Sequence, residues 1–229
     1  MMRTVIGCLA GILLLVSAAR AQMVYEDGFS RSGDLHGTAP ETRPGTETWN
    51  VLMADPGTQS ATTDSTRLNV VGGGGLQNIF AHLPFAAPED RWFYVEADMD
   101  QTGGNDWMAI GFSSAADNGY GSNIAWMLLR NDGKMQAFES GTSGVYYNTS
   151  TAPAGSGTVT IRITIDPTQP TPTLALSVNG SQVADTTIPT ATLNNIATVT
   201  IGGRQGNGSF DNFTLYKKAP PAGTMVLIR

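Results

Sequence analysis

The sequence predicts an all-β fold, a single sandwich of two antiparallel sheets. About a dozen short strand-like segments alternate with glycine-rich turns, and no segment keeps a helical period for long. The two ends carry similar aromatic and acidic strands, at residues 24–29 and 209–216, which indicates first and last strands that lie side by side. Together these observations favour a sandwich that its own terminal strands close.

The first 21 residues have the pattern of a secretory signal peptide. Arg3 gives a positive start, residues 5–16 form an apolar stretch, and Ala19-Arg20-Ala21 is a small-residue cleavage pattern. The apolar run is shorter than the roughly 20 residues that a membrane-spanning helix needs. We therefore expect no membrane insertion, and a mature chain that starts at Gln22 and is secreted to the periplasm or the extracellular space.

Composition excludes several classes of function. The one cysteine, Cys8, falls within the signal peptide, so the mature chain is expected to have no disulfide and no thiolate site. Loss of Arg3 and Arg20 with that peptide moves the net charge from −6 to −8, and no basic cluster offsets it. Nucleic acid is therefore not an expected partner, whereas a polysaccharide or other glycan suits this polar surface.

The clearest strand is at residues 158–166, where β-branched apolar residues occupy every second position. Asn179-Gly180 predicts a type I′ turn and hence a hairpin over residues 173–187. Asn131-Asp132-Gly133 predicts a looser turn between strands at 124–130 and 134–139. Further strands are expected at 24–29, 49–53, 67–71, 77–83, 92–100, 107–113, 197–202 and 209–216.

The segments between strands fit loops within one domain better than linkers between domains. Gly72 to Gly75 lacks the Lys-Ser or Lys-Thr pair of a phosphate loop, so it is expected to be a turn. The division that we predict is a signal peptide at 1–21, one sandwich domain at 22–217 and a short tail at 218–229.

Six short motifs follow one another in a particular order along residues 24–216. They are Asp27-Gly28-Phe29, Trp107 to Phe112, Ala125 to Arg130, Val178-Asn179-Gly180, Ile201-Gly202-Gly203 and Phe210 to Phe213. This order resembles the concanavalin A-like lectin and glucanase jelly rolls, in particular the laminin G-like domains of exported bacterial proteins. The resemblance implies a jelly-roll sandwich and a lectin-like activity. Pro220 to Arg229 is similar to the start of a bacterial sorting tail, and the alternative is a frayed terminus.

Residues 92–100 alternate between apolar and polar side chains. With the apolar residues inward, Trp92, Tyr94, Glu96 and Asp98 point outward from what we expect to be a concave sheet. Rings that pack on sugar faces, beside carboxylates that accept hydroxyl hydrogen bonds, are typical of a sugar-binding groove. These four are candidate ligand-binding residues. The plainer alternative is a strand with one wet face and no function.

Three further residues are candidate ligand contacts. Trp107 alternates with apolar residues that face the core, so it is expected to point away from the core. Arg130 ends the next strand and could donate to a glycan or pair with Asp132. Tyr146 lies in a turn-rich segment that could rim a groove, although an edge strand is the commoner explanation. Trp126, in a continuous apolar run, is expected to be core.

Residues 96–100 also resemble the catalytic Glu-x-Asp-x-Glu strand of laminarinase-type glycoside hydrolases. Asp100 replaces the last glutamate, and its shorter side chain moves that carboxyl group away from the bond to be protonated. Glu96 and Asp100 would be the catalytic pair of a divergent hydrolase. Catalysis is therefore the less favoured prediction.

Calcium is the metal that the sequence suggests. If the terminal strands pair, Asp27 approaches Asp211, and carboxylate oxygens are ligands that Ca²⁺ prefers. The alternative is that these aspartates cap turns or bind backbone amides.

Three hypotheses follow from the sequence. The first is a non-catalytic, lectin-like module that binds a glycan. The second is a structural or matrix protein with no small ligand, and the third is a divergent glycoside hydrolase.

Overall fold

The computed structural model describes residues 22–73, 77–149 and 157–218. The predicted signal peptide and nearly all of the predicted tail lie outside this part of the chain. No helix among the described residues is long and apolar enough to cross a membrane.

The described residues form fourteen strands, the short helix α1 (Thr190–Leu193) and one 3₁₀ turn, η1 (Tyr120–Ser122). The strands are β1 (Gln22–Asp27), β2 (Ser32–Asp34), β3 (Asn50–Met53), β4 (Ser60–Asp64), β5 (Leu68–Val71), β6 (Asn78–Pro84), β7 (Phe93–Ser113), β8 (Asn123–Arg130), β9 (Met135–Ser140), β10 (Ser143–Asn148), β11 (Val159–Asp166), β12 (Thr173–Val178), β13 (Ser181–Thr187) and β14 (Thr198–Lys217).

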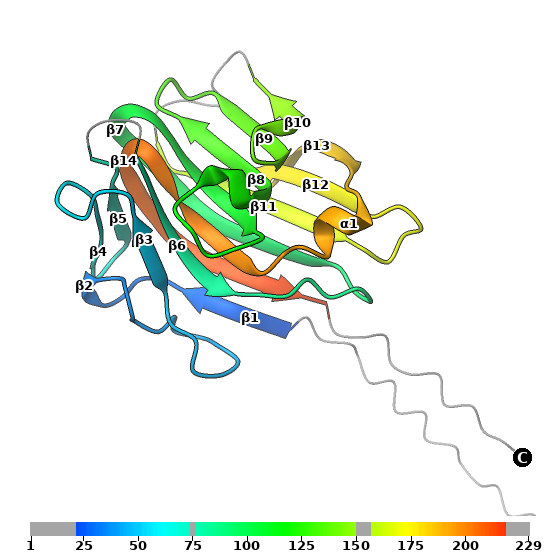
Figure 1. Ribbon diagram of the computed structural model, residues 1–229, viewed down its shortest axis with the longest axis horizontal. Helices are drawn as coiled ribbons and strands as arrows, with labels where there is room; N and C mark the ends of the chain where they lie inside the picture. The colour runs from blue at the N-terminus through cyan, green and yellow to red at the C-terminus, as the bar shows by residue number, and fades with distance from the viewer. Residues whose placement is uncertain (1–21, 74–76, 150–156, 219–229) are drawn as a thin grey trace, which may run out of the picture.

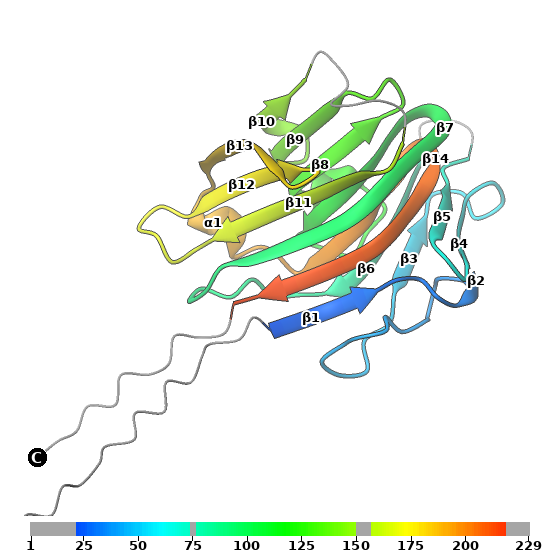
Figure 2. The same ribbon diagram turned by 180° about the vertical axis from the view of Figure 1, so that it is seen from behind.

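The strands form two antiparallel layers, which share the long curved strands β7 and β14 (Figure 1). The front sheet has the order β10-β9-β8-β7-β14-β6-β3 and uses residues 107–113 of β7 and 198–204 of β14. The back sheet, nearer the viewer in Figure 2, has the order β13-β12-β11-β7-β14-β1 and uses residues 93–99 and 208–217. Strand β5 pairs with the middle of β14, β4 pairs with β5, and β2 pairs with β4.

The main hydrophobic core lies between the two sheets. Alternate residues of β11, Ile161, Ile163 and Ile165, face it and are fully buried. From β7 it receives Phe93 to Met99 at every second position, and then Met108 and Ile110. The two-sheet sandwich that the alternation predicts is confirmed, because each sheet buries one face in this shared core.

The terminal strands pair as predicted. Strand β1 runs antiparallel to the end of β14, with Glu26 opposite Thr214 and Asp27 opposite Phe213. The predicted hairpin turn is also present, because Asn179 and Gly180 have positive φ angles of 50° and 77° between β12 and β13. Two such angles in sequence define the type I′ turn.

The structure differs from the prediction in its longest strands. The segments expected at 92–100 and 107–113 are one strand, β7, and those at 197–202 and 209–216 are one strand, β14. Both contain glycines that act as strand breaks in a sequence-based prediction. In the structure the pairing continues through them with register shifts, among them one between Asn207 and Gly208. Shifts of this kind bend a strand and let it pass from one sheet to the other.

Candidate functional site

A second, smaller apolar cluster lies on the outward face of the front sheet. Trp107 and Ala109 alternate along β7 with Met108 and Ile110, which face the main core, so the two sets lie on opposite faces. The buried members of this outer cluster are Phe80, Trp107, Ala109, Trp126, Leu128 and Phe138, and half-buried Tyr120 packs against them. Apolar burial on both faces explains why β8 reads as a continuous apolar run.

The aromatic rings of the outer cluster contact one another in a row. The ring centroids of Trp107 and Trp126 are 5.2 Å apart in an edge-to-face arrangement, and Trp126 stacks on Phe138 at 5.4 Å. Tyr120 meets Trp107 edge-on at 6.4 Å. The Trp126 Nε1 group donates a hydrogen bond to the Gly141 carbonyl at 2.7 Å, so the polar atom of this buried indole has a partner.

A bulge between β7 and β8 directs Trp126 to this face. Ile110 pairs with Met127 but Phe112 pairs with Ile124, so β8 has an extra residue there. Ala125 takes a positive φ of 44°, which is rare for a residue other than glycine. Opposite the bulge, a Cβ atom on Gly111 would lie 2.4 Å from the Cβ of Trp126. The absence of a side chain at Gly111 is therefore what lets Trp126 lie against β7.

The row of rings is the apolar wall of a pocket of about 170 Å³. Arg130, Gln136, Thr142 and Arg204 contribute polar groups to its lining. The full lining is Trp107, Tyr120, Trp126, Leu128, Arg130, Gln136, Phe138, Thr142 and Arg204. Aromatic walls with a few polar groups are typical of a ligand site, although this volume is below the range for drug-sized ligands. The pocket is therefore suited to one small ring or one end of a longer ligand.

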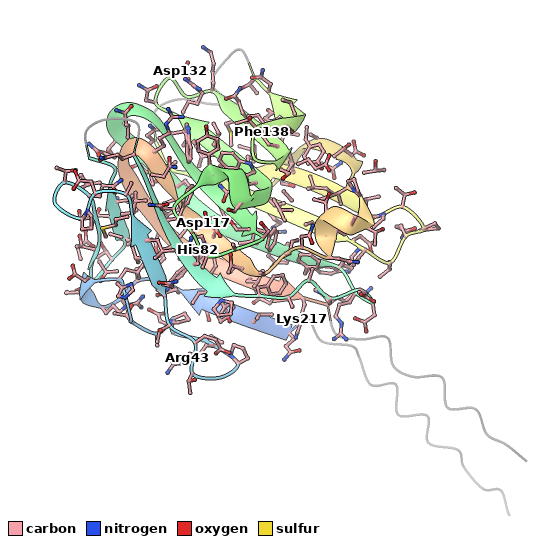
Figure 3. The ribbon with its side chains drawn as sticks, in the orientation of Figure 1. Arg43, His82, Asp117, Asp132, Phe138 and Lys217 are labelled. Atoms are coloured by element: carbon pink, nitrogen blue, oxygen red, sulfur yellow. The ribbon has the colours of Figure 1, made fainter. Side chains whose placement is uncertain are left out.

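The segment that joins β7 to β8 forms one side of this pocket. It contains η1, and two side chains of β6 contact its backbone. The Asn78 amide donates to the Asn118 carbonyl at 2.8 Å, and His82 Nε2 lies 2.8 Å from the Asp117 carbonyl. Figure 3 shows His82 and Asp117 next to each other on the front of the molecule. Arg204 lies over the ring of Tyr120, with its guanidinium carbon 5.8 Å from the ring centroid. These contacts position Tyr120 at the pocket.

His82 is buried at the base of this segment. Its Nδ1 atom lies 2.9 Å from the Thr200 hydroxyl, which in turn lies 3.0 Å from the hydroxyl of Ser113. Burial lowers the pKa of His82, although the Asp117 carbonyl and the charge of Asp117 act in the opposite direction. A neutral imidazole that donates from Nε2 to the carbonyl and accepts at Nδ1 from the hydroxyl fits this geometry.

The outward face of the back sheet has aromatic residues as well, but they pack against one another. Tyr94 stacks on Tyr216 at 5.1 Å and on Trp92 at 6.1 Å, and the Arg162 guanidinium lies over the Tyr94 ring at 4.4 Å. Burial raises the pKa of Tyr94, partly offset by the charge of Arg162. We call these four residues the back ladder. Its rings contact one another, and all three are half-buried.

The carboxylates beside the back ladder also have partners. Glu96 accepts a hydrogen bond from Arg162 Nε at 2.6 Å, and this contact raises the pKa of Arg162. Asp98 accepts hydrogen bonds from the Thr160 hydroxyl and the Asn212 amide. As the sequence predicts, Trp92, Tyr94, Glu96 and Asp98 alternate with the buried residues of β7.

The structure therefore separates the predicted ligand residues into three places. Trp107 and Arg130 line the pocket, whereas Trp92, Tyr94, Glu96 and Asp98 lie on the outward face of the other sheet. Tyr146 lies on the edge strand β10 and packs against the main core. Sequence reasoning missed the pocket residues Tyr120, Phe138 and Arg204. Its assignment of Trp126 to the core is confirmed, because this residue is buried, and the structure places it in the outer cluster.

Asp27 and Asp211, the suggested calcium ligands, have different surroundings. Asp27 is fully buried; its carboxylate accepts two hydrogen bonds from the Arg31 guanidinium, at 2.9 and 2.7 Å, and one from Trp49 Nε1 at 2.7 Å. The Phe29 backbone N–H also donates to it, at 2.9 Å. Asp27 thus ties the loop after β1 to Trp49 in the core.

Asp211 lies opposite Asp98 of β7, whereas Asp27 lies opposite Phe213, so the pairing of the terminal strands does not place the two aspartates in register. Within residues 22–73, 77–149 and 157–218, no group of three or more His, Cys, Asp or Glu residues is arranged to hold a metal ion.

Comparison with known proteins finds likeness in structure alone. No family model matches the sequence, and no curated protein matches it. An endo-1,3-beta-glucanase from Streptomyces sioyaensis superimposes with a TM-score of 0.60 at 14% identity, over 87% of this chain and 97% of that one. A Bacillus subtilis protein with a galectin-like fold gives 0.55 at 9% identity, over 88% and 100%. The carbohydrate recognition domain of Emp46p gives 0.53 at 13% identity, over 84% and 97%.

These likenesses, with the two antiparallel sheets, show that the chain has a concanavalin A-like jelly-roll fold. At such low identity they show the fold and no more, so the function is argued from the pocket.

Proposed function

We propose that this protein is a secreted, non-catalytic carbohydrate-binding protein whose site is the pocket on the outward face of the front sheet. The observation that carries the proposal is the wall of aromatic rings with polar groups beside it, on the face where Trp107, Tyr120 and Trp126 meet. An aromatic ring offers a flat apolar surface to a sugar ring, and side chains with hydrogen-bond donors orient the hydroxyl groups. Secretion is inferred from the signal-peptide pattern of residues 1–21.

The fold supports this proposal. Structural neighbours include a carbohydrate recognition domain and a glucanase, so a jelly roll of this shape serves proteins that recognise sugars. The non-catalytic part of the proposal rests on the surroundings of Glu96, the residue that would be a catalytic carboxylate. It is ion-paired with Arg162 on the back sheet, far along β7 from the pocket residue Trp107.

The experiment is a polysaccharide array probed with the wild-type protein, read for both binding and product release, with calcium and with a chelator. Retention on at least one glycan without release of reducing ends supports the proposal. Silence on every glycan contradicts it and favours the structural role, and release of reducing ends shows catalysis. Comparing the calcium and chelator arms tests whether binding depends on calcium.

A further inference from the structure

The pocket combines aromatic rings with positive charge, in a chain whose net charge is negative. The sequence has 13 lysine and arginine residues against 19 aspartate and glutamate residues. Two of these arginines, Arg130 and Arg204, line the pocket, and none of the described residues that line it is acidic. The local charge of the lining is therefore opposite in sign to the charge of the whole protein.

The pairing of the strands sets the positions of these charges. Trp107 of β7 pairs with Arg130 on β8 and with Arg204 on β14, so the indole lies in a row between the two arginines. Neighbouring strands are about 4.8 Å apart, which places the two arginine backbones roughly 10 Å from each other. Like charges held across one aromatic residue repel each other, and a bound anion relieves that repulsion.

Arg130 is held loosely by protein groups. Its Nε atom lies 4.0 Å from Asp132, whereas Lys134 Nζ lies 2.7 Å from the same carboxylate. The pKa of Asp132 is lowered, first by the hydrogen bond from the Lys134 side chain, with a smaller effect from Arg130. The Arg130 side chain is 37% exposed. By contrast, Arg162 on the back sheet lies 2.6 Å from Glu96.

We propose that the pocket binds an anionic sugar, with the sugar ring against the aromatic wall and its carboxylate or sulfate group on Arg130. This inference rests on the proposed carbohydrate-binding function and specifies the class of ligand. The planar guanidinium fork fits both anions through paired hydrogen bonds. Arg204 makes contacts of its own and stacks on Tyr120, so the inference depends on Arg130.

The test compares trigalacturonic acid with its methyl ester, which keeps the sugar backbone and removes the charge. Galactose 6-sulfate against galactose forms a second arm, which distinguishes sulfate from carboxylate. We expect the wild-type protein to bind at least one anionic probe at least about tenfold more tightly than its neutral counterpart, because charge-assisted hydrogen bonds are stronger than neutral ones. That preference should shrink as the salt concentration rises.

Three variants test whether Arg130 is the residue that holds the anion. Arg130→Gln should remove the preference for the anion, and Arg162→Gln on the back sheet is the matched control that should keep it. Asp132→Asn should strengthen binding of the anion about twofold, because it removes a carboxylate that competes for Arg130. Unchanged thermal melting of Arg130→Gln shows that the loss does not come from unfolding.

The outcomes separate this inference from the proposed function. If the methyl ester and galactose bind as tightly as the charged probes, the pocket binds neutral sugars. If Arg130→Gln keeps the preference for the anion, Arg130 is not the group that holds it. In either case the inference is wrong while the proposed function stands. If the protein binds none of these probes and no glycan of the array, the proposed function is wrong and the inference is wrong with it.

Discussion

The two outward faces of the sandwich carry similar residues, but their side chains contact different things. The back face has Trp92, Tyr94 and Tyr216 stacked on one another, with Arg162 bound to Glu96. On the front face the rings form one wall of an open pocket. Aromatic rings beside charges therefore do not define a binding site by themselves. What distinguishes the front face is space next to the rings and an arginine that protein carboxylates hold loosely.

Removing one indole from each face should give the largest contrast. Trp126→Ala should cost about 3–5 kcal/mol of unfolding free energy and abolish glycan binding, because it empties a buried site in the outer cluster. Trp92→Ala should cost less, about 1–2 kcal/mol of unfolding free energy, because this half-buried indole loses part of its buried area and one ring contact, and it should leave binding intact. Urea denaturation and titration with the array glycan measure both. Glycan binding that depends on Trp92 and not on Trp126 would place the site on the back face.

Gly111→Ala should act on the front face alone. A new Cβ would lie 2.4 Å from the Trp126 Cβ, so the strands must shift or the indole must move. We expect a loss of about 1–3 kcal/mol of unfolding free energy, typical of overpacking, and weaker glycan binding. Gly103→Ala is the matched control, because nothing lies within 4 Å of a Cβ built there. Equal effects of the two substitutions would refute the role of Gly111 at Trp126.

Acid should weaken the front face through His82. Burial holds the pKa of this residue below its ordinary value of 6.5, so on acidification the unfolded chain takes up a proton before the folded protein does. The contribution of His82 to stability is complete above about pH 6.5 and declines below it. Between pH 7.5 and pH 5, the melting temperature of the wild-type protein should fall more steeply than that of His82→Gln. Parallel curves for the two proteins would contradict this assignment.

Breaking the ion pair on the back face should change the free energy of unfolding least. Glu96→Gln should lower the free energy of unfolding by at most about 1 kcal/mol, as expected for a partly exposed ion pair, and should leave glycan binding unchanged. It also tests the hydrolase hypothesis, since a catalytic glutamate cannot be replaced by glutamine without loss of turnover. If wild type releases reducing ends from any glycan and Glu96→Gln does not, the back face is an active site.

The fold was largely predictable because local chemistry decides it. Alternation in residues 158–166 and the Asn179-Gly180 turn each indicate one structure, and the structure has both. The continuity of β7 and β14 was not predictable, because glycines that break most strands here permit register shifts between sheets. Short strands such as β2, three residues long and exposed, carry no apolar pattern to detect.

The site was less predictable, because long-range contacts decide it. Trp107 could be placed outward by parity along its strand, and the structure agrees. Trp126 could not, because the bulge at Ala125 lies inside an apolar run that shows no alternation. The partners of Asp27 were equally hidden, since Trp49 is 22 residues away along the chain.

The most direct test of the central claim follows the four tryptophan indole N–H signals by NMR while the array glycan is added. Single Trp→Phe substitutions assign the signals of Trp49, Trp92, Trp107 and Trp126. If the front pocket is the site, Trp107 and Trp126 shift with a common Kd while Trp92 does not move. A titration in which Trp92 shifts and the front pair stays fixed would contradict the account.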